Sequence, residues 1–277
     1  MTHPPKLTER AALLRNRTRA LRQGAELFLH EDCAAEIEER LGEVNKRFTS
    51  PAIVTGFPGP WAKVLPGARI VEDAETLALE PGAHDLIVHG LALHWANDPV
   101  GQLVQCRRAL KPDGLFLCAM FGGQTLFELR ACLAEAESRL TGGLSPRVLP
   151  MAEIRDLGGL LQRAGFALPV ADAAKKTVTY TTAFHLIADL RAMGEGNALQ
   201  SRSRRATPRE LFPEAARLYA ATYPAPEGRI TATFELIFLT GWAPDESQQK
   251  PLRPGSAAQR LADALGATET PLDPRER

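Results

Sequence analysis

The segment His89–Trp95 places two imidazoles and an indole close together in the sequence. A histidine side chain takes up and releases a proton near neutral pH, so His94 is our candidate for a general base. His89 and Trp95 flank it, and all three are candidates for a wall that faces a substrate. The competing interpretation is structural, with Trp95 packed against a neighbouring helix. The sequence assigns no other catalytic residue.

Composition excludes several kinds of protein. The chain of 277 residues carries 33 basic and 33 acidic side chains, and this zero net charge argues against a coat for nucleic acid or an anionic membrane. No apolar run approaches the roughly 18 residues of a membrane span. The six histidines are scattered, so we expect no metal site. The cysteines have no disulfide-type spacing, and we expect reduced, mostly buried thiols at Cys33, Cys106, Cys118 and Cys132.

Apolar patterns predict strands that alternate with helices, which is typical of an α/β fold with a largely parallel sheet. The strands are predicted at 51–56, 85–89, 115–120, 176–182 and 229–241. The helices between them are predicted at 32–48, 99–110, 125–140, 152–164, 183–193 and 208–222.

Ligands of such sheets bind beyond the carboxyl ends of the strands. This rule directs attention to four places, namely Gly56–Gly59, Asp73, His89–Trp95 and Met120–Gly123. The last two strands are expected to form an antiparallel hairpin at one edge, with a helical insertion at 183–228 between them. That insertion is a candidate lid over a substrate, and the tyrosines at 180, 219 and 223 are candidates to line it.

The two ends of the chain differ from this central domain, which we expect to span 51–242. Residues 1–50 are predicted to form helices, and the first of these is rich in arginine. It suits either a mitochondrial-type targeting peptide or a mature surface helix. We favour the surface helix because the pattern continues through Glu26–His30 into a second amphipathic helix. Residues 243–277 are predicted to be a mostly irregular tail with one short helix at 257–265.

Several segments together resemble one enzyme family. They are the run from His84 to Arg130 and the short elements Arg163-Ala-Gly-Phe166, Met193-Gly-Glu195, Gly241-Trp242 and Glu246-Ser-Gln248. With these segments the chain resembles the class I S-adenosylmethionine (SAM)-dependent methyltransferases. It is most similar to the branch of the mitochondrial complex I assembly factor with a methyltransferase fold. The malonyl-carrier-protein methyltransferase of biotin synthesis is a more distant relative. The resemblance covers nearly the whole chain.

This resemblance implies a Rossmann-like, seven-stranded sheet with SAM over its first strands and substrate beneath the C-terminal insertion. The cofactor-binding residues that it implies are Gly56, Gly59, Asp73, His89 and Leu91. The substrate-side residues are Trp95, Met120 and Tyr180.

The glycine-rich loop departs from the family pattern. Glycines let the backbone approach the cofactor, and the following helix offers N–H donors. Here the loop keeps Gly56 and Gly59, but Val54 stands where an acidic residue is expected. Pro58 and Pro60 remove two backbone donors. The loop therefore suits either a cofactor cradle or a plain tight turn.

Spacing indicates that part of the cofactor half is missing. Only 26 positions (85 minus 59) separate Gly59 from Asp85, whereas a complete fold needs roughly 60 for the strands and helices between them. We prefer an alignment in which Arg69–Asp73 is the third strand, which leaves the second strand without a counterpart. The rival alignment makes Glu72 or Asp73 the ribose-binding acid of the second strand and deletes the third. Either way we expect a shortened N-terminal cofactor half.

Three functions follow from the resemblance. The first is a SAM-dependent methyltransferase that acts on a protein or carrier-bound substrate by in-line attack on the sulfonium, with a possible link to complex I assembly. The second is hydroxylation of an arginine. The third is a non-catalytic assembly factor that has lost SAM. All three predict a protein or carrier-protein partner, in the bacterial cytoplasm or, in a eukaryote, the mitochondrial matrix.

Overall fold

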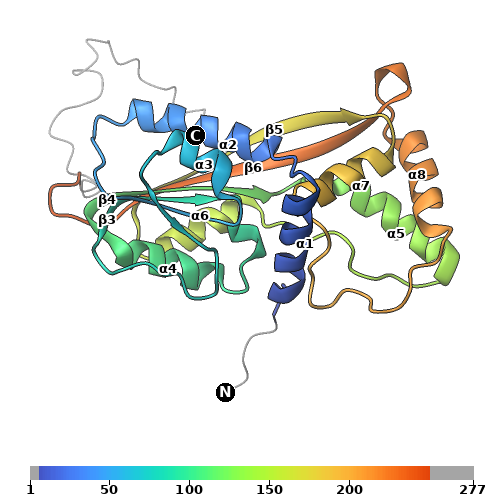
Figure 1. Ribbon diagram of the computed structural model, residues 1–277, viewed down its shortest axis with the longest axis horizontal. Helices are drawn as coiled ribbons and strands as arrows, with labels where there is room; N and C mark the ends of the chain where they lie inside the picture. Colours follow the sequence, from blue (N-terminus) through green and yellow to red (C-terminus); the bar gives the residue numbers. More distant parts are fainter. Residues whose placement is uncertain (1–5, 250–277) are drawn as a thin grey trace, which may run out of the picture. The chain divides into compact units, whose positions relative to one another are not determined.

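The computed structural model describes residues 6–249. The chain divides into two compact units, 1–245 and 246–277, and every element named below belongs to the first. Its centre is a six-stranded sheet with the strand order β2-β1-β3-β4-β6-β5 (Figure 1). This is the Rossmann-like α/β fold that the sequence predicts. The short helix expected at 257–265 lies outside the described residues.

The middle of the sheet consists of parallel strands built from the apolar runs. β1 (Pro51–Thr55), β3 (His84–Gly90) and β4 (Leu110–Gly122) lie side by side. Each is almost wholly buried because helices cover both faces of the sheet, as is usual for parallel strands. Their carboxyl ends therefore meet at one edge, where a site is expected.

The cofactor half of the sheet is shortened, as the spacing predicts. β2 (Arg69–Val71) has three residues and pairs in parallel with β1. In a doubly wound sheet the neighbour of the first strand on this side is the second strand. The strand thus takes the spatial position of the rival alignment, and our preference for the third strand is wrong in this respect. The place beyond β2 is empty of any described strand.

The other edge of the sheet is the expected antiparallel hairpin. β5 (Ala167–Tyr180) pairs with β6 (Ile230–Trp242) along most of its length, and β6 also pairs with β4. α7 (Ala183–Ala192), α8 (Leu211–Thr222) and the short η2 turn (Pro226–Gly228) lie between the two strands in sequence. β5 begins earlier than predicted and includes Pro169, which an edge strand tolerates.

Helices form a layer on each face of the sheet. α4 (Pro99–Ala109) and α6 (Ile154–Arg163) cover one face and share a core cluster with the side chains that point there. The opposite face has a larger core and is covered by α2 (Phe28–Glu43), α3 (Pro58–Val64), α5 (Phe127–Thr141), α7 and α8. All four cysteines are free and buried in these cores, as predicted.

The N-terminal helices differ from prediction in one respect. α1 (Arg10–Gln23) ends at Gly24, whose φ of 86° breaks the helical path before α2. The pattern therefore does not continue unbroken through Glu26–His30. In the view of Figure 1, α1 lies between α4 on one side and α5, α7 and α8 on the other, and it buries Ala12, Leu13 and Ala20. No helix among the described residues has the length and apolar character needed to cross a membrane.

Candidate functional site

The chain turns sharply after β3 and carries an aromatic side chain into a cavity. Leu91 has a φ of 45°, and its N–H donates to the Ala119 carbonyl (2.9 Å), which ties the turn to β4. A short η1 helix follows at Leu93–Trp95. Leu91 is thus a buried residue of the turn, and Trp95 lines the cavity. Trp95 also belongs to a core cluster with Leu13 of α1, which agrees with the structural interpretation, and its role on the substrate side stays a prediction.

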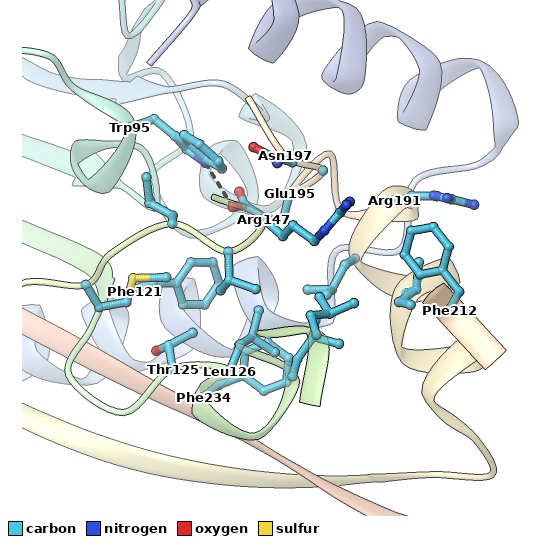
Figure 2. A pocket seen from close by; sticks show the side chains of 18 residues that line it. Trp95, Phe121, Thr125, Leu126, Arg147, Arg191, Glu195, Asn197, Phe212 and Phe234 are labelled. Atoms are coloured by element: carbon cyan, nitrogen blue, oxygen red, sulfur yellow. Dashed lines mark hydrogen bonds between the residues drawn. The ribbon is translucent and has the colours of Figure 1, made fainter. Parts of the chain in front are cut away.

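The cavity lies between the carboxyl end of the sheet and the inserted helices (Figure 2). Its volume is about 180 Å³, and a cavity of roughly 150 Å³ admits a group as large as benzene. It therefore has room for one amino-acid side chain. Its walls are mainly apolar: Phe121, Leu126, Leu129, Leu190, Phe212 and Phe234.

Glu195 supplies a carboxylate to this apolar cavity, and its side chain is 9% exposed. One of its oxygens, Oε2, accepts a hydrogen bond from Trp95 Nε1 (2.9 Å) and lies 3.4 Å from His94 Nε2. Among the described residues the other oxygen, Oε1, has no hydrogen-bond partner. Burial alone would raise the pKa of Glu195, but His94 and the Arg17 guanidinium outweigh burial and lower the pKa below its ordinary value. The side chain is thus an anion with one oxygen available.

The other polar side chains of the cavity are largely committed to partners within the chain. Arg147 forms an ion pair with Glu137, with Nη2 2.7 Å from Oε1. Asn197 donates to the Pro146 carbonyl, and Thr125 donates to the backbone of β4. Arg191 lies at the rim (Figure 2) and has no ion pair among the described residues. The cavity therefore presents one available anion and, at its rim, one available cation.

His94 lies behind the cavity wall. Its side chain is 2% exposed and packs against the Phe121 ring, with 4.9 Å between ring centroids. Nε2 faces Glu195, while the buried Nδ1 has no hydrogen-bond partner within residues 6–249. The structure thus brings His94 next to Trp95 and Glu195, and its role as a general base stays a prediction.

Three of the predicted residues do not reach the cavity. His89 points to the opposite face of the sheet, where its Nε2 bonds Gln102 Oε1 (2.9 Å) and burial lowers its pKa to about 4. Met120 also faces that side and packs in the core beneath α4 and α6. Tyr180 donates a hydrogen bond to Asp189 (2.7 Å) at the base of α7. Alternation along the strands explains the first two positions, since neighbouring residues face opposite sides.

Asp73 is buried and paired with two arginines of α1. Its Oδ1 accepts from Arg17 Nη1 (2.7 Å) and from Arg10 Nη2 (2.9 Å). Burial would raise the pKa of this carboxyl, but Arg10 and Arg17 together hold the pKa below its ordinary value. The carboxylate at the end of β2 is therefore occupied by this chain's own cations rather than solvated.

The two loop glycines have different surroundings. A Cβ added to Gly56 would lie 2.3 Å from the Arg17 guanidinium carbon, whereas a Cβ on Gly59 would meet no atom of the described part of the chain within 4 Å. A third glycine, Gly90 at the end of β3, is covered by the Trp61 ring at 2.4 Å from the added Cβ. Trp61 is held there by a hydrogen bond from its Nε1 to His30 Nδ1 (3.1 Å).

Sequence reasoning missed Glu195, the main polar group of the cavity. Its only signal was the element Met193-Gly-Glu195 within the resemblance. Outside the cavity, Arg202 and Arg204 both form ion pairs with Glu9. In residues 6–249 no cluster of His, Cys, Asp or Glu is arranged to hold a metal ion.

The sequence of this chain is similar to those of several known proteins. Residues 59–118 match the model of the methyltransferase domain. The chain is 41% identical over 209 residues to "Arginine-hydroxylase NDUFAF5, mitochondrial" of Dictyostelium discoideum, with 74% of this chain and 48% of that protein covered. It is 38% identical over 213 residues to the human protein of the same name, with 77% and 61% covered.

A bacterial methyltransferase is also similar. The chain is 35% identical over 179 residues to the malonyl-[acyl-carrier protein] O-methyltransferase of Xylella fastidiosa (strain M23), with 65% of this chain and 58% of that protein covered. These matches support the class I SAM-dependent methyltransferase family for this chain. It spans about half to three fifths of the length of these relatives.

The family match supports SAM as the cofactor, and the structure tests whether the cradle can receive it. In this family glycines let the cofactor approach the strand ends, but here Arg17 covers Gly56 and Trp61 covers Gly90. Asp73 is already paired with arginines. The cofactor therefore does not fit this arrangement of side chains, and we derive no reaction step through it.

Proposed function

We propose that this methyltransferase-family protein binds an arginine side chain of a protein substrate in the cavity beneath the inserted helices, and that it serves the assembly of a respiratory complex. The carrying observation is the largely enclosed Glu195 carboxylate, with Oε1 unpartnered among the described residues, in a cavity with apolar walls. The name of the NDUFAF5 relatives agrees with this choice of side chain.

Arginine matches both parts of the cavity. Its aliphatic stem favours apolar walls, here including Phe121 and Leu190. Its planar guanidinium forms directional, charge-assisted hydrogen bonds with a carboxylate. Glu195 Oε1 has no partner among the described residues, so this carboxylate oxygen gains a favourable one when a guanidinium enters.

A malonyl group on a carrier protein is the less favoured substrate. It carries a carboxylate and would need a cation inside the cavity. The inner cation, Arg147, is neutralised by Glu137, and Arg191 lies at the rim. The observed charges therefore favour a cationic side chain over an anionic one.

Both the enzyme and the assembly-factor hypotheses require that the protein hold its substrate. Binding of an arginine side chain in this cavity is therefore expected under either one. We assign the protein to the compartment where respiratory complexes are assembled, which is the cytoplasm in a bacterium and the mitochondrial matrix in a eukaryote. Methyl transfer to the bound side chain additionally needs an open cofactor cradle.

A calorimetric titration tests the proposal with two peptides that differ in one group. The first carries arginine and the second carries citrulline, its neutral isostere, at the same position. We expect the arginine peptide to bind at least about tenfold more tightly, which corresponds to about 1.4 kcal/mol. It should also raise the melting temperature, since it binds only the folded state.

The matched variant is Glu195→Gln, which keeps the shape of the side chain and removes its charge. We expect it to bind both peptides equally, while Glu135→Gln on the exposed face of α5 keeps the preference for arginine. Equal binding of the two peptides by the unsubstituted protein would reject the proposal. Tighter binding of a malonyl-carrier protein than of the arginine peptide would favour the competing substrate.

A further inference from the structure

The Arg17 side chain occupies the centre of the cofactor half of the molecule. It is 5% exposed and 2.7 Å from Asp73 Oδ1, whose own side chain is 2% exposed. Its guanidinium lies against the backbone of Gly56, and its stem lies against Gly194. The Phe57 ring is 5.9 Å from the guanidinium carbon. Arg17 thus fills space at the end of β1 rather than reaching into solvent.

The contacts of Arg17 coincide with those that a SAM molecule requires. Gly56 is the loop glycine over which the family's cofactor passes, and Asp73 is the carboxylate at the end of the neighbouring strand β2. An arginine also carries a positive charge, as the sulfonium of SAM does. The Arg17 guanidinium therefore takes up the space over Gly56 and, together with Arg10, the acid of the cradle.

The helix that carries Arg17 is fixed independently of this contact. Asn16 donates to the Gly196 carbonyl (2.9 Å), and the Glu9 N–H donates to the Ala198 carbonyl (2.8 Å). Glu9 also pairs with Arg202 (2.8 Å). These bonds hold α1 on the segment that follows α7. They fix the position of Arg17 without any contribution from its own side chain.

One atom of Arg17 shows that the contact is not fully satisfied. Nε is buried and has no hydrogen-bond partner among the described residues, and leaving a buried donor unpartnered is unfavourable. The ion pair with Asp73 opposes this cost. The ion pair and the close packing therefore favour the observed position of Arg17, while the unpartnered Nε opposes it. The second contribution would vanish if the side chain moved into solvent.

We propose that Arg17 is a built-in occupant of the cofactor cradle, so that SAM binds only when this side chain leaves Gly56 and Asp73. The cradle is closed by α1 in the absence of the cofactor, and Arg17 competes with SAM for the same surface. The proposal concerns the cofactor half alone and does not depend on which substrate enters the Glu195 cavity.

Two substitutions at the same position separate the effects of volume and charge. Arg17→Ala empties the space over Gly56, while Arg17→Met removes the charge but keeps most of the volume. Both lose the ion pair with Asp73, so they are matched in that destabilising change. Arg19→Ala, on the exposed face of the same helix, serves as a control for helix substitutions.

The measurement is calorimetric titration of each full-length protein with SAM and with S-adenosylhomocysteine, after circular dichroism has established that each variant is folded. We expect Arg17→Ala to bind at least about tenfold more tightly than the unsubstituted protein. Arg17→Met and Arg19→Ala should retain the weaker affinity.

Two results would overturn the proposal. One is equal affinity of the unsubstituted protein and Arg17→Ala, including the case in which neither binds at millimolar ligand. The other is an equal gain in Arg17→Met and Arg17→Ala, because the filled volume would then be irrelevant. Neither result bears on the arginine-peptide titration, so the two proposals fail separately.

Discussion

Two glycines at strand ends allow bulky side chains to pack directly against the backbone. Gly56 and Gly90 each touch a bulky side chain that a Cβ would displace, whereas Gly59 faces open space. In the sequence Gly56 and Gly59 look equivalent, since both belong to the same loop. The structure separates them, because only Gly56 is covered by another element.

Gly90→Ala should destabilise the fold. The new Cβ would lie 2.4 Å from the Trp61 ring, which is buried and hydrogen-bonded to His30 and so has little freedom to move. Overpacking of this kind costs about 1–3 kcal/mol. The free energy of unfolding in urea is the measurement.

Gly59→Ala is the matched control, since it also adds one methyl group but meets no atom within 4 Å. It lies inside α3 and should be neutral or stabilising by up to about 1 kcal/mol. Equal destabilisation by the two substitutions would show that Trp61 does not constrain Gly90.

At the scale of elements, α1 is an integral part of the fold. Its buried face joins Leu13 to Trp95 and to Leu149 in a small core cluster of its own. Its arginines reach Asp73, and its first turn bonds to the segment after α7. The helix thus connects the cofactor half with the segment that bears Glu195.

Leu13→Ala should therefore cost about 2–5 kcal/mol, the usual range for a buried leucine that leaves a cavity. Leu13 is 0% exposed. Leu21→Ala on the same helix is the control, because Leu21 is 59% exposed and its loss should change stability by at most about 0.5 kcal/mol. Thermal or urea unfolding distinguishes them, and a small effect at Leu13 would mean that α1 is only loosely attached.

The sequence predicted most of these elements, and the exceptions have physical reasons. The periodic apolar pattern correctly indicated α4, α5, α7, α8 and the β5–β6 hairpin. It missed α3, because its two prolines suggested a loop although proline suits the first turn of a helix. It also missed the break at Gly24, since the apolar pattern continues across it while the backbone does not.

At the scale of the whole molecule, buried histidines couple stability to pH. Burial lowers the pKa of His30 and of His89 to about 4. In the unfolded chain a histidine binds its proton below about pH 6.5. The unfolded state therefore binds more protons between these values, so stability falls as the pH drops from about 6.5 towards 4.

The expected loss by pH 5 is about 1–2 kcal/mol for each of these histidines. It is measured as the difference in the free energy of urea unfolding between pH 7 and pH 5. His89→Gln should reduce the difference because its side chain no longer titrates, while His185→Gln at an exposed position should leave it unchanged. An unfolding free energy that stays constant over this range would contradict the expectation.

The candidate site was predicted only in part, because its members come from distant segments. Trp95 stood out by its place beyond a buried strand. Glu195 lies 100 positions away in the sequence from the Trp95 indole that it contacts, and no local pattern links them. Arg17 and Asp73 are likewise 56 positions apart. Their pairing depends on the packing of α1, which apolar periodicity does not specify.

The shortened sheet also has consequences for association between chains. An edge strand exposes unpaired backbone groups that can pair with another molecule. At one edge β2 offers only the three residues Arg69–Val71, too few for a stable ladder. At the other edge β5 is 14 residues long, but it carries exposed lysines at 175 and 176 and an irregular register near Val170. Brevity at one edge and positive charge at the other thus both oppose aggregation through strand addition.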